Sequence, residues 1–424
     1  MHSATPKHLH PLLGRRLADW VVEGVRELGP APLVVVASPD ASDAFEGVEV
    51  AVQQQPLGTG DATAAARPAL EGFEGDILVV SGDAAAITTD TLGRLLETHR
   101  GENAAATVLS FDRDDPGAYG RVVRGPDGNL QAIVEAVDAT DEELALTEIN
   151  SSIYVFAADK LWPALERLEP KNKQGELYLT DTVRDLVQTG ERVAVYKDDD
   201  DAEVGVNTRA ELASIASTLR DRINHEHMLA GATIVDPKTT WIEPSVELEP
   251  DTTIHPFTIL QGETRVAGGA EVGPHAVVVD SEVGPSALVG PFCYLRPGTV
   301  LEAGAKAGAF VEIKNSRIGK RTKVPHQSYI GDADIGEETN IGAGNITANF
   351  PHEDGRPKGR TKIGRNVRTG VHNAFVAPVE IGDDAWIGAG SVITDDVPPE
   401  ALAIARQRQV TKEGYVRKRQ EEDG

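Results

Sequence analysis

The chain has 424 residues, of which 40% are hydrophobic and 5% are aromatic, and a chain of this length usually forms more than one hydrophobic core. Its formal net charge of −26 argues against general binding to nucleic acid or to anionic membranes, because both would repel it. The one cysteine, Cys293, excludes an internal disulfide framework, and every apolar run is far shorter than a membrane span. We therefore expect a soluble, cytoplasmic protein of two domains without membrane insertion.

The first half of the chain alternates helical periodicity with short β-rich runs. Four runs stand out, at residues 33–36, 77–80, 106–109 and 153–156. This alternation predicts an α/β domain over residues 1–207 with a largely parallel sheet. Residues 208–232 then predict a connecting amphipathic helix, because Leu212, Ile215, Leu219 and Ile223 are spaced for one helical face.

A repeat of six residues fills most of the second half. Aliphatic residues recur at Ile242, Leu248, Ile254, Leu260, Val266, Val272 and Val278, and after a slip of one residue the repeat resumes at Val283 and continues to Ile393. Such a period fits neither an amphipathic helix nor a hairpin, but it suits a solenoid with one short strand and one turn per face. The pattern resembles the left-handed parallel β-helix of hexapeptide repeats, which we expect over residues 233–400, with a tail at 401–424.

Several segments break the repeat in a recognisable order. They are Leu295-Arg296-Pro297-Gly298, residues 310–315, residues 325–333 and Asn340-Ile341-Gly342-Ala343-Gly344. In order and spacing they resemble the bifunctional family of glucosamine-1-phosphate acetyltransferase and N-acetylglucosamine-1-phosphate uridylyltransferase. The resemblance runs from about Ser3 to Lys418, nearly the whole chain. It implies the synthesis of UDP-N-acetylglucosamine and a homotrimer.

The resemblance implies an acceptor site on the solenoid. His326 matches the general base, Arg296 and Lys314 match residues that hold the sugar phosphate, and Tyr329 and Asn340 match further sugar contacts. The roles suit the chemistry, because a sugar ammonium must lose a proton before its nitrogen attacks a thioester, and a base with a pKa near neutrality serves best. Two cations in so acidic a chain are also reasonable if they meet an anion.

The resemblance also implies acetyl-CoA as the donor. Its contacts would be Ala343, Asn349, Phe350, Ala389 and Arg406. Two departures from the family pattern affect this region: residues 351–355 carry one extra residue, and Val371 stands where the family has a serine. These changes put the affinity for the donor, and the choice of donor and acceptor, in question.

In the first half the resemblance implies a site for UTP and UDP-N-acetylglucosamine with magnesium. Asp83 and Asn207 match the metal ligands, and the matched nucleotide and sugar contacts are Lys7, Gln53, Gly58, Thr59, Gly120, Glu135, Asn150 and Asn207. One aspartate suffices, because Mg²⁺ usually keeps water and phosphate oxygens as ligands. Two departures weaken the match, since Ala85 replaces a proline and Val137 replaces a lysine of the family pattern.

A further expectation concerns the start of the chain. In the family, a strand and a glycine-rich loop that cradles the UTP phosphates precede the position of Ser3, so about twenty residues of a strand plus phosphate loop are expected to be missing. A chain without them would expose a central sheet edge and be nearly inactive in uridylyl transfer. We therefore expect a start placed too late.

Two other interpretations stay open at this point. The chain could be a sugar-1-phosphate nucleotidyltransferase whose β-helix serves only assembly or regulation, which the altered region around Val371 would favour. It could also be a non-catalytic trimerising or ligand-sensing protein, if both sites were catalytically inactive. His326, Arg296 and Lys314 argue against the first of these, and ligand binding without turnover in both assays would favour the second.

Overall fold

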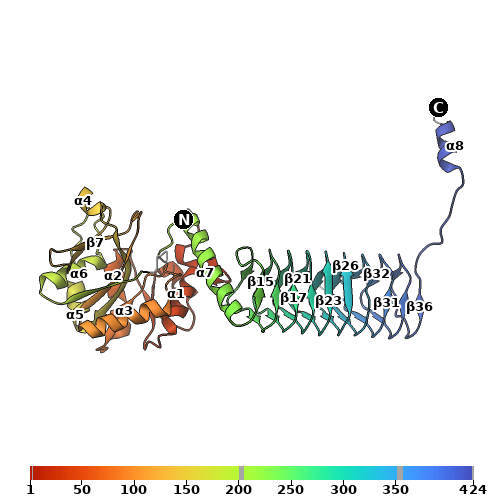
Figure 1. Ribbon diagram of the computed structural model, residues 1–424, viewed down its shortest axis with the longest axis horizontal. Helices are drawn as coiled ribbons and strands as arrows, with labels where there is room; N and C mark the ends of the chain where they lie inside the picture. The colour runs from red at the N-terminus through yellow and green to blue at the C-terminus, as the bar shows by residue number, and fades with distance from the viewer. Residues whose placement is uncertain (2, 200–204, 351–356, 423–424) are drawn as a thin grey trace. The chain divides into compact units, whose positions relative to one another are not determined.

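The computed structural model describes the chain except for residues 2, 200–204, 351–356 and 423–424. The chain divides into two compact units, Met1–Leu219 and Arg220–Gly424. Figure 1 shows an α/β unit followed by a stack of short strands. No helix in the described part is both long and apolar enough to cross a lipid bilayer.

The first unit is built around a six-stranded sheet in the order β10-β6-β9-β7-β8, with β5 also paired to β9. Its strands and those of two small sheets are β1 (Pro11–Leu12), β2 (Arg15–Arg16), β3 (Val34–Ala37), β4 (Glu49–Val52), β5 (Asp76–Val79), β6 (Ala106–Asp112), β7 (Arg121–Arg124), β8 (Leu130–Val134), β9 (Glu148–Ala157) and β10 (Val193–Lys197). Its helices are η1 (Lys7–Leu9), α1 (Leu17–Arg26), η2 (Pro39–Ala44), α2 (Thr59–Ala65), η3 (Arg67–Leu70), α3 (Thr89–Glu102), α4 (Asp141–Leu144), α5 (Ala158–Glu166), α6 (Leu179–Gln188) and the first part of α7 (Arg209–Leu229). All four predicted β-rich runs overlap strands.

The expectation of a largely parallel sheet was wrong. β9 runs antiparallel to β5, β6 and β7, while β10 and β6 are parallel. The reason is that the β7–β8 hairpin lies between β6 and β9 in the chain, and β9 then returns along β6 in the opposite direction. The run at residues 153–156 is therefore the end of a ten-residue returning strand.

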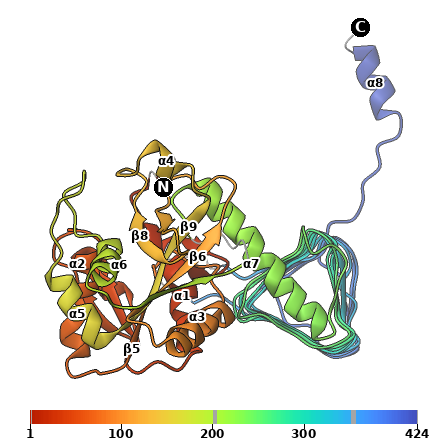
Figure 2. The same cartoon turned by 60° about the vertical axis from the view of Figure 1, so that its left-hand side comes forward.

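Successive side chains of β9 pack against helices on opposite faces of the sheet. Tyr154 and Phe156 face a core with α5 and α6, whereas Ile153 and Val155 face a core with α1 and α3. Successive strand residues point to opposite faces of a sheet, so a strand covered on both sides reads as one continuous apolar run. Figure 2 shows α5 and α6 on one side of the sheet and α1 and α3 on the other.

The strands β3 and β5 each keep one edge without a strand partner. Among the described residues, β3 pairs only with β4, and β5 only with β9. Most side chains of β3 and all of β5 are only half-buried, whereas six of the seven residues of β6 are buried. The six-stranded sheet is thus well covered at β6 and less covered at β5, and β3 in the separate β3–β4 sheet is also less covered.

The second unit is a parallel β-helix of three sheets. The first sheet holds β11 (Thr233–Ile234), β14 (Thr253–Ile254), β17 (Glu271–Val272), β20 (Leu288–Val289), β23 (Lys306–Ala309) and β26 (Lys323–His326), and farther along β31 (Arg368–Thr369), β34 (Trp386–Ile387) and β36 (Leu402–Ala403). The second holds β12 (Trp241–Ile242), β15 (Ile259–Gln261), β18 (Val277–Val279), β21 (Tyr294–Leu295), β24 (Glu312–Lys314), β27 (Tyr329–Gly331), β29 (Ile346–Ala348), β32 (Ala374–Val376) and β35 (Val392–Ile393). The third holds β13 (Glu247–Leu248), β16 (Arg265–Val266), β19 (Ser281–Val283), β22 (Thr299–Leu301), β25 (Arg317–Ile318), β28 (Ala333–Ile335), β30 (Thr361–Ile363) and β33 (Val379–Ile381).

The predicted repeat corresponds to the strand register. Ile242 pairs with Leu260, which pairs with Val278, and all three are fully buried. The predicted slip is also present, since Val266 pairs with Val283 and the next coil is one residue shorter. In the view of Figure 2 the coils superpose as a triangle. The aliphatic residues of the repeat are buried.

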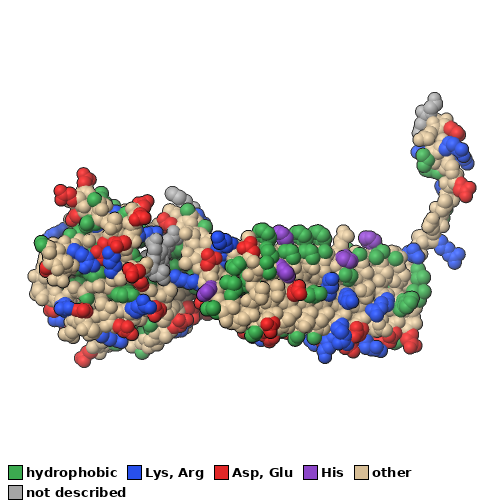
Figure 3. Space-filling model, in the orientation of Figure 1, with side chains coloured by type: hydrophobic (Ala, Val, Ile, Leu, Met, Phe, Trp, Pro, Cys, Tyr) green, Lys and Arg blue, Asp and Glu red, His purple; other side chains and the backbone are tan. Residues whose placement is uncertain are grey.

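One corner of the solenoid carries a column of rings, which we call the aromatic corner: Phe257, His275, Phe292 and Phe310. Neighbouring rings stack with centroids 4.7, 4.8 and 5.1 Å apart. All four residues adopt φ values of 55–58°, a left-handed conformation that a non-glycine residue takes up at some cost. Figure 3 shows hydrophobic and histidine side chains gathered on this part of the solenoid surface.

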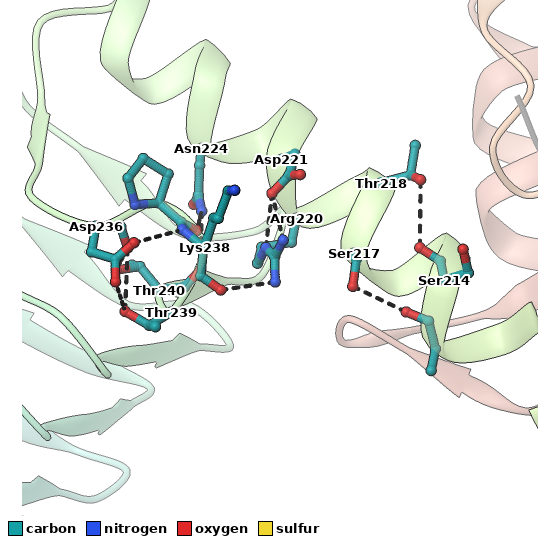
Figure 4. Close-up of polar contacts among 12 residues, drawn as sticks. Ser214, Ser217, Thr218, Arg220, Asp221, Asn224, Asp236, Lys238, Thr239 and Thr240 are labelled. Atoms are coloured by element: carbon teal, nitrogen blue, oxygen red, sulfur yellow. Dashed lines mark hydrogen bonds and ion pairs between the residues drawn. The ribbon is translucent and has the colours of Figure 1, made fainter. Parts of the chain in front are cut away.

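The helix α7 ends on the first coil of the solenoid, as Figure 4 shows. Asn224 is fully buried and donates to the carbonyls of Pro237 and Thr240, at 2.8 and 2.9 Å. The guanidinium of Arg220 donates to the Lys238 carbonyl at 2.9 Å. The helix therefore covers the open end of the apolar column. At the other end, β36 is followed by an exposed tail with the helix α8 (Tyr415–Glu422).

Candidate active sites

The predicted metal ligands lie together in the first unit. Asp83 lies in a tight turn after β5, and Asn207 lies two residues before the start of α7. The ammonium of Lys7 forms an ion pair with Asp83 Oδ2 and donates to Asn207 Oδ1 at 3.0 Å. These two oxygens therefore both contact a cation, and one carboxylate and one amide oxygen are ligand types that suit a magnesium ion.

A second group of predicted residues meets where β7, β8 and β9 approach one another. The Asn150 amide nitrogen of the backbone donates to the Gly120 carbonyl at 2.9 Å, and the Asn150 side chain donates to the buried Tyr154 hydroxyl at 2.7 Å. A side chain on Gly120 would press against Ile133 and Glu135. Burial raises the pKa of Glu135, and the Thr180 hydroxyl that donates to it at 3.1 Å opposes this effect.

Tyr119 links these two groups and was missed by the sequence analysis. Its hydroxyl donates to the Gly205 carbonyl at 3.4 Å, and Gly205 lies over the Asp83 carboxylate, since a Cβ there would be 3.6 Å from Oδ2. Burial raises the pKa of Tyr119, so the phenol stays protonated. Its position beside Gly120 was the available signal.

The predicted uracil contacts form a third group. Gln53 donates to the Gly58 carbonyl at 3.1 Å and to Asp61 at 2.9 Å, while the Thr59 hydroxyl accepts from the Leu179 amide at 2.9 Å. Gly58 has φ of 119°, and a side chain there would collide with the Leu177 backbone. Glycine is thus required at this position. Within the described residues, no hydrogen bond or ion pair joins this group to Asp83.

On the solenoid, the predicted acceptor residues occupy neighbouring strands of the second sheet. Leu295, Ile313 and Ile330 are in register, with Arg296 directly after β21, Lys314 at the end of β24 and Tyr329 at the start of β27. Adjacent strands lie about 4.8 Å apart. Arg296 donates to Glu312 at 2.8 Å, so its charge is partly matched by a neighbouring carboxylate.

Lys358 is a second residue that the sequence analysis missed. Its ammonium lies beside that of Lys314, and this contact, with a smaller effect of Arg296, lowers the pKa of Lys314. Three cations thus converge on one part of the solenoid surface. The available signal was its position in the sequence, just after the altered segment at residues 351–355. Residues 351–356 themselves lie outside the described residues.

The predicted base stands at a corner of the same region. His326 ends β26 and Tyr329 begins β27, and Gln327 between them has φ of 44°. The imidazole is exposed and, in the part of the chain that the structure describes, makes no hydrogen bond or ion pair. The imidazole is therefore accessible to a ligand.

The predicted donor contacts differ in place and in burial. Ala343, Ala389 and Arg406 lie along the last coils of the solenoid, with the coil of His372 between those of Ala343 and Ala389. The Ala343 carbonyl accepts from the His372 backbone amide, a side chain on Gly370 would collide with Ala389, and Arg406 lies near Gly390. Phe350 and Val371 are exposed, at 74% and 46%. Asn349 is instead buried and donates to Asp332, which also accepts from Asn315 at 2.5 Å. Asn340 bridges the coils of Lys323 and Arg368.

Comparisons with known proteins cover the whole chain. The family described as MobA-like NTP transferase domain matches residues 1–193. The Bifunctional protein GlmU of Mycobacterium bovis is 44% identical over 448 residues, covering 99% of this chain and 90% of the relative. That of Mycolicibacterium gilvum is 44% identical over 98% of this chain and 89% of the relative, and that of Corynebacterium efficiens 43% over 99% and 91%.

These relatives span both units, so the predicted family and fold class are confirmed and a β-helix used only for assembly is not supported. The chain belongs to the bifunctional GlmU family, with the acetyltransferase and uridylyltransferase activities that make UDP-N-acetylglucosamine.

Proposed function

We propose that the two reactions use separate sets of residues, with acetyl transfer on the solenoid and uridylyl transfer in the first unit. The observation that carries the first assignment is the convergence of Lys314, Lys358 and Arg296 near a corner where His326 stands exposed. Adjacent ammonium groups repel each other, so they favour an anionic ligand such as a sugar phosphate.

In the acetyl transfer, His326 accepts a proton from the ammonium of glucosamine-1-phosphate. The freed nitrogen attacks the thioester carbonyl of acetyl-CoA, the carbon–sulfur bond breaks, and the second proton of the nitrogen passes to the leaving thiolate. Lys314, Arg296 and Lys358 hold the phosphate, and Tyr329 and Asn340 contact the sugar. Ala343, Asn349, Phe350, Ala389 and Arg406 contact the donor.

In the uridylyl transfer, an oxygen of N-acetylglucosamine-1-phosphate attacks the α-phosphorus of UTP, and the bond to the departing pyrophosphate breaks. Gln53, Gly58 and Thr59 hold the uracil, while Gly120, Glu135 and Asn150 hold the sugar. Asp83 and Asn207 would hold Mg²⁺, which when bound offsets negative charge on the phosphates. Lys7 supplies a further positive charge near them.

We also propose a homotrimer, with the aromatic corner as part of the contact surface. Phe257, Phe292 and Phe310 are 52%, 48% and 64% exposed, and exposed apolar patches commonly mark protein interfaces. The unpaired, buried Cys293 agrees with the reducing cytoplasm as the place of action.

A paired assay tests both assignments. Thiol release from acetyl-CoA with glucosamine-1-phosphate should fall by about 10²–10⁴ in His326→Ala, and pyrophosphate release from UTP should fall by about 10²–10³ in Asp83→Ala. His255→Ala, at a half-buried residue of the solenoid, and Asp40→Ala, at an exposed residue of the first unit, are the matched controls. An active His326→Ala would contradict the assignment of the base, and absence of pyrophosphate release from the parent chain would contradict the uridylyl site in this chain.

A further inference from the structure

The ammonium of Lys7 occupies the position between the two proposed metal ligands. It pairs with Asp83 Oδ2 and donates to Asn207 Oδ1 at 3.0 Å, and it reaches them from the short helix η1. Lys7 is 38% exposed in its side chain, while Asp83 is only 14% exposed. The carboxylate is thus largely shielded from water, and its exposed partner is the lysine.

Both residues are also held by groups other than Lys7. The Ser81 hydroxyl donates to the second oxygen of Asp83, Oδ1, at 2.7 Å. The backbone amide of Asn207 donates to Glu211 at 2.5 Å, which fixes the turn before α7. Because other contacts position both residues, the pair of oxygens forms a ready cation site that Lys7 fills without being needed to build it.

An ammonium and a divalent cation cannot share these oxygens. Their like charges would lie a few ångströms apart in a partly buried place, where Coulomb repulsion is weakly screened. A metal ion that enters must therefore break the Lys7–Asp83 ion pair first, and its apparent affinity falls accordingly.

We propose that Lys7 blocks the metal site of the nucleotide-free enzyme and moves away when a triphosphate arrives. The inference rests on the proposed role of Asp83 and Asn207. The phosphates offer Lys7 an alternative anion and offer the metal additional oxygen ligands, so the metal enters with the nucleotide rather than before it. Lys7 thereby acts as a positioning residue that sets the order of binding.

The test measures Mn²⁺ binding to the nucleotide-free full chain by the loss of the free-ion EPR signal. Lys7→Met, which keeps most of the length of the side chain without its charge, should bind Mn²⁺ about tenfold more tightly than the parent, as expected for removing one competing cation. Lys7→Arg keeps the charge and should bind as weakly as the parent. Asp83→Asn added to Lys7→Met should abolish the gain.

Equal or weaker Mn²⁺ binding by Lys7→Met, with an unchanged circular dichroism spectrum, would overturn the proposal. Tight binding by Lys7→Arg would overturn it as well. These outcomes differ from a failure of the proposed function, which would appear as full pyrophosphate release by Asp83→Ala. If the Asp83 variant is inactive but Lys7→Met gains no affinity, the metal site stands and only the blocking role of Lys7 fails.

Discussion

The two units assemble their sites in different ways. On the solenoid, Arg296, Lys314 and Tyr329 come from consecutive strands of one sheet, so their spacing along the chain fixes their spacing in space. In the first unit, Lys7 lies 76 and 200 residues from its partners Asp83 and Asn207. A site of the second kind exists only when the whole unit is folded, whereas a site of the first kind depends mainly on neighbouring coils.

The largest effect is expected from a change in the core of the first unit, which tests whether the two units lose their activities separately. Leu161 is fully buried against the sheet, and Leu161→Ala should lower the free energy of unfolding of that unit by about 2–5 kcal/mol. Calorimetry should show one early transition, with loss of uridylyl transfer but retention of acetyl transfer. The matched change Ile313→Ala in the solenoid core should affect acetyl transfer first. Loss of both activities together in Leu161→Ala would contradict independent units.

A change at the proposed acceptor site tests the solenoid separately from the first unit. Lys358→Ala should raise KM for glucosamine-1-phosphate about tenfold, because one of three converging cations is lost. Steady-state thiol release measures this, and uridylyl transfer should not change. Lys362→Ala, which removes an exposed lysine 3.8 Å from Glu380, is the control and should have little effect. An unchanged KM in Lys358→Ala would exclude this lysine from phosphate binding.

A smaller effect is expected at the aromatic corner. Phe292 stacks between His275 and Phe310, and each aromatic pair contributes about 0.5–1.5 kcal/mol. Phe292→Ala should therefore lower the unfolding temperature of the solenoid, measured by circular dichroism, while that of the first unit stays constant. Leu288→Ala, another exposed apolar residue of the solenoid outside the stack, provides the comparison. Equal effects of the two changes would argue that stacking adds nothing.

The smallest expected effect depends on pH and concerns the first unit alone. Because burial raises the pKa of Glu135, the folded state favours its protonated form. The stability from this preference is complete below the unfolded pKa and is lost as pH rises through the folded value. Glu135→Gln should therefore raise the melting temperature of the first unit at pH 8 by about 2–4 °C, equivalent to about 1 kcal/mol, and change little at pH 4. A uniform shift at both values would contradict this cause.

More of the fold could be predicted from the sequence in the solenoid than in the first unit. The six-residue spacing of Ile242, Leu260 and Val278 predicted both burial and pairing, since each coil contacts only its neighbours. In the first unit the apolar run at residues 153–156 predicted a strand but not its direction, because periodicity carries no information on which strand it joins. The hairpin β7–β8 decided that β9 is antiparallel.

The sequence by itself determined the repeat, the family resemblance and the identity of His326, Lys314 and Asp83 as candidates, because each rests on residue type and local spacing. Only the tertiary structure decided that Lys358 lies beside Lys314, that the Tyr119 hydroxyl contacts Gly205, and that Lys7 contacts both Asp83 and Asn207. These contacts join segments far apart in the chain, and their energies depend on distance and burial, which spacing along a sequence does not specify.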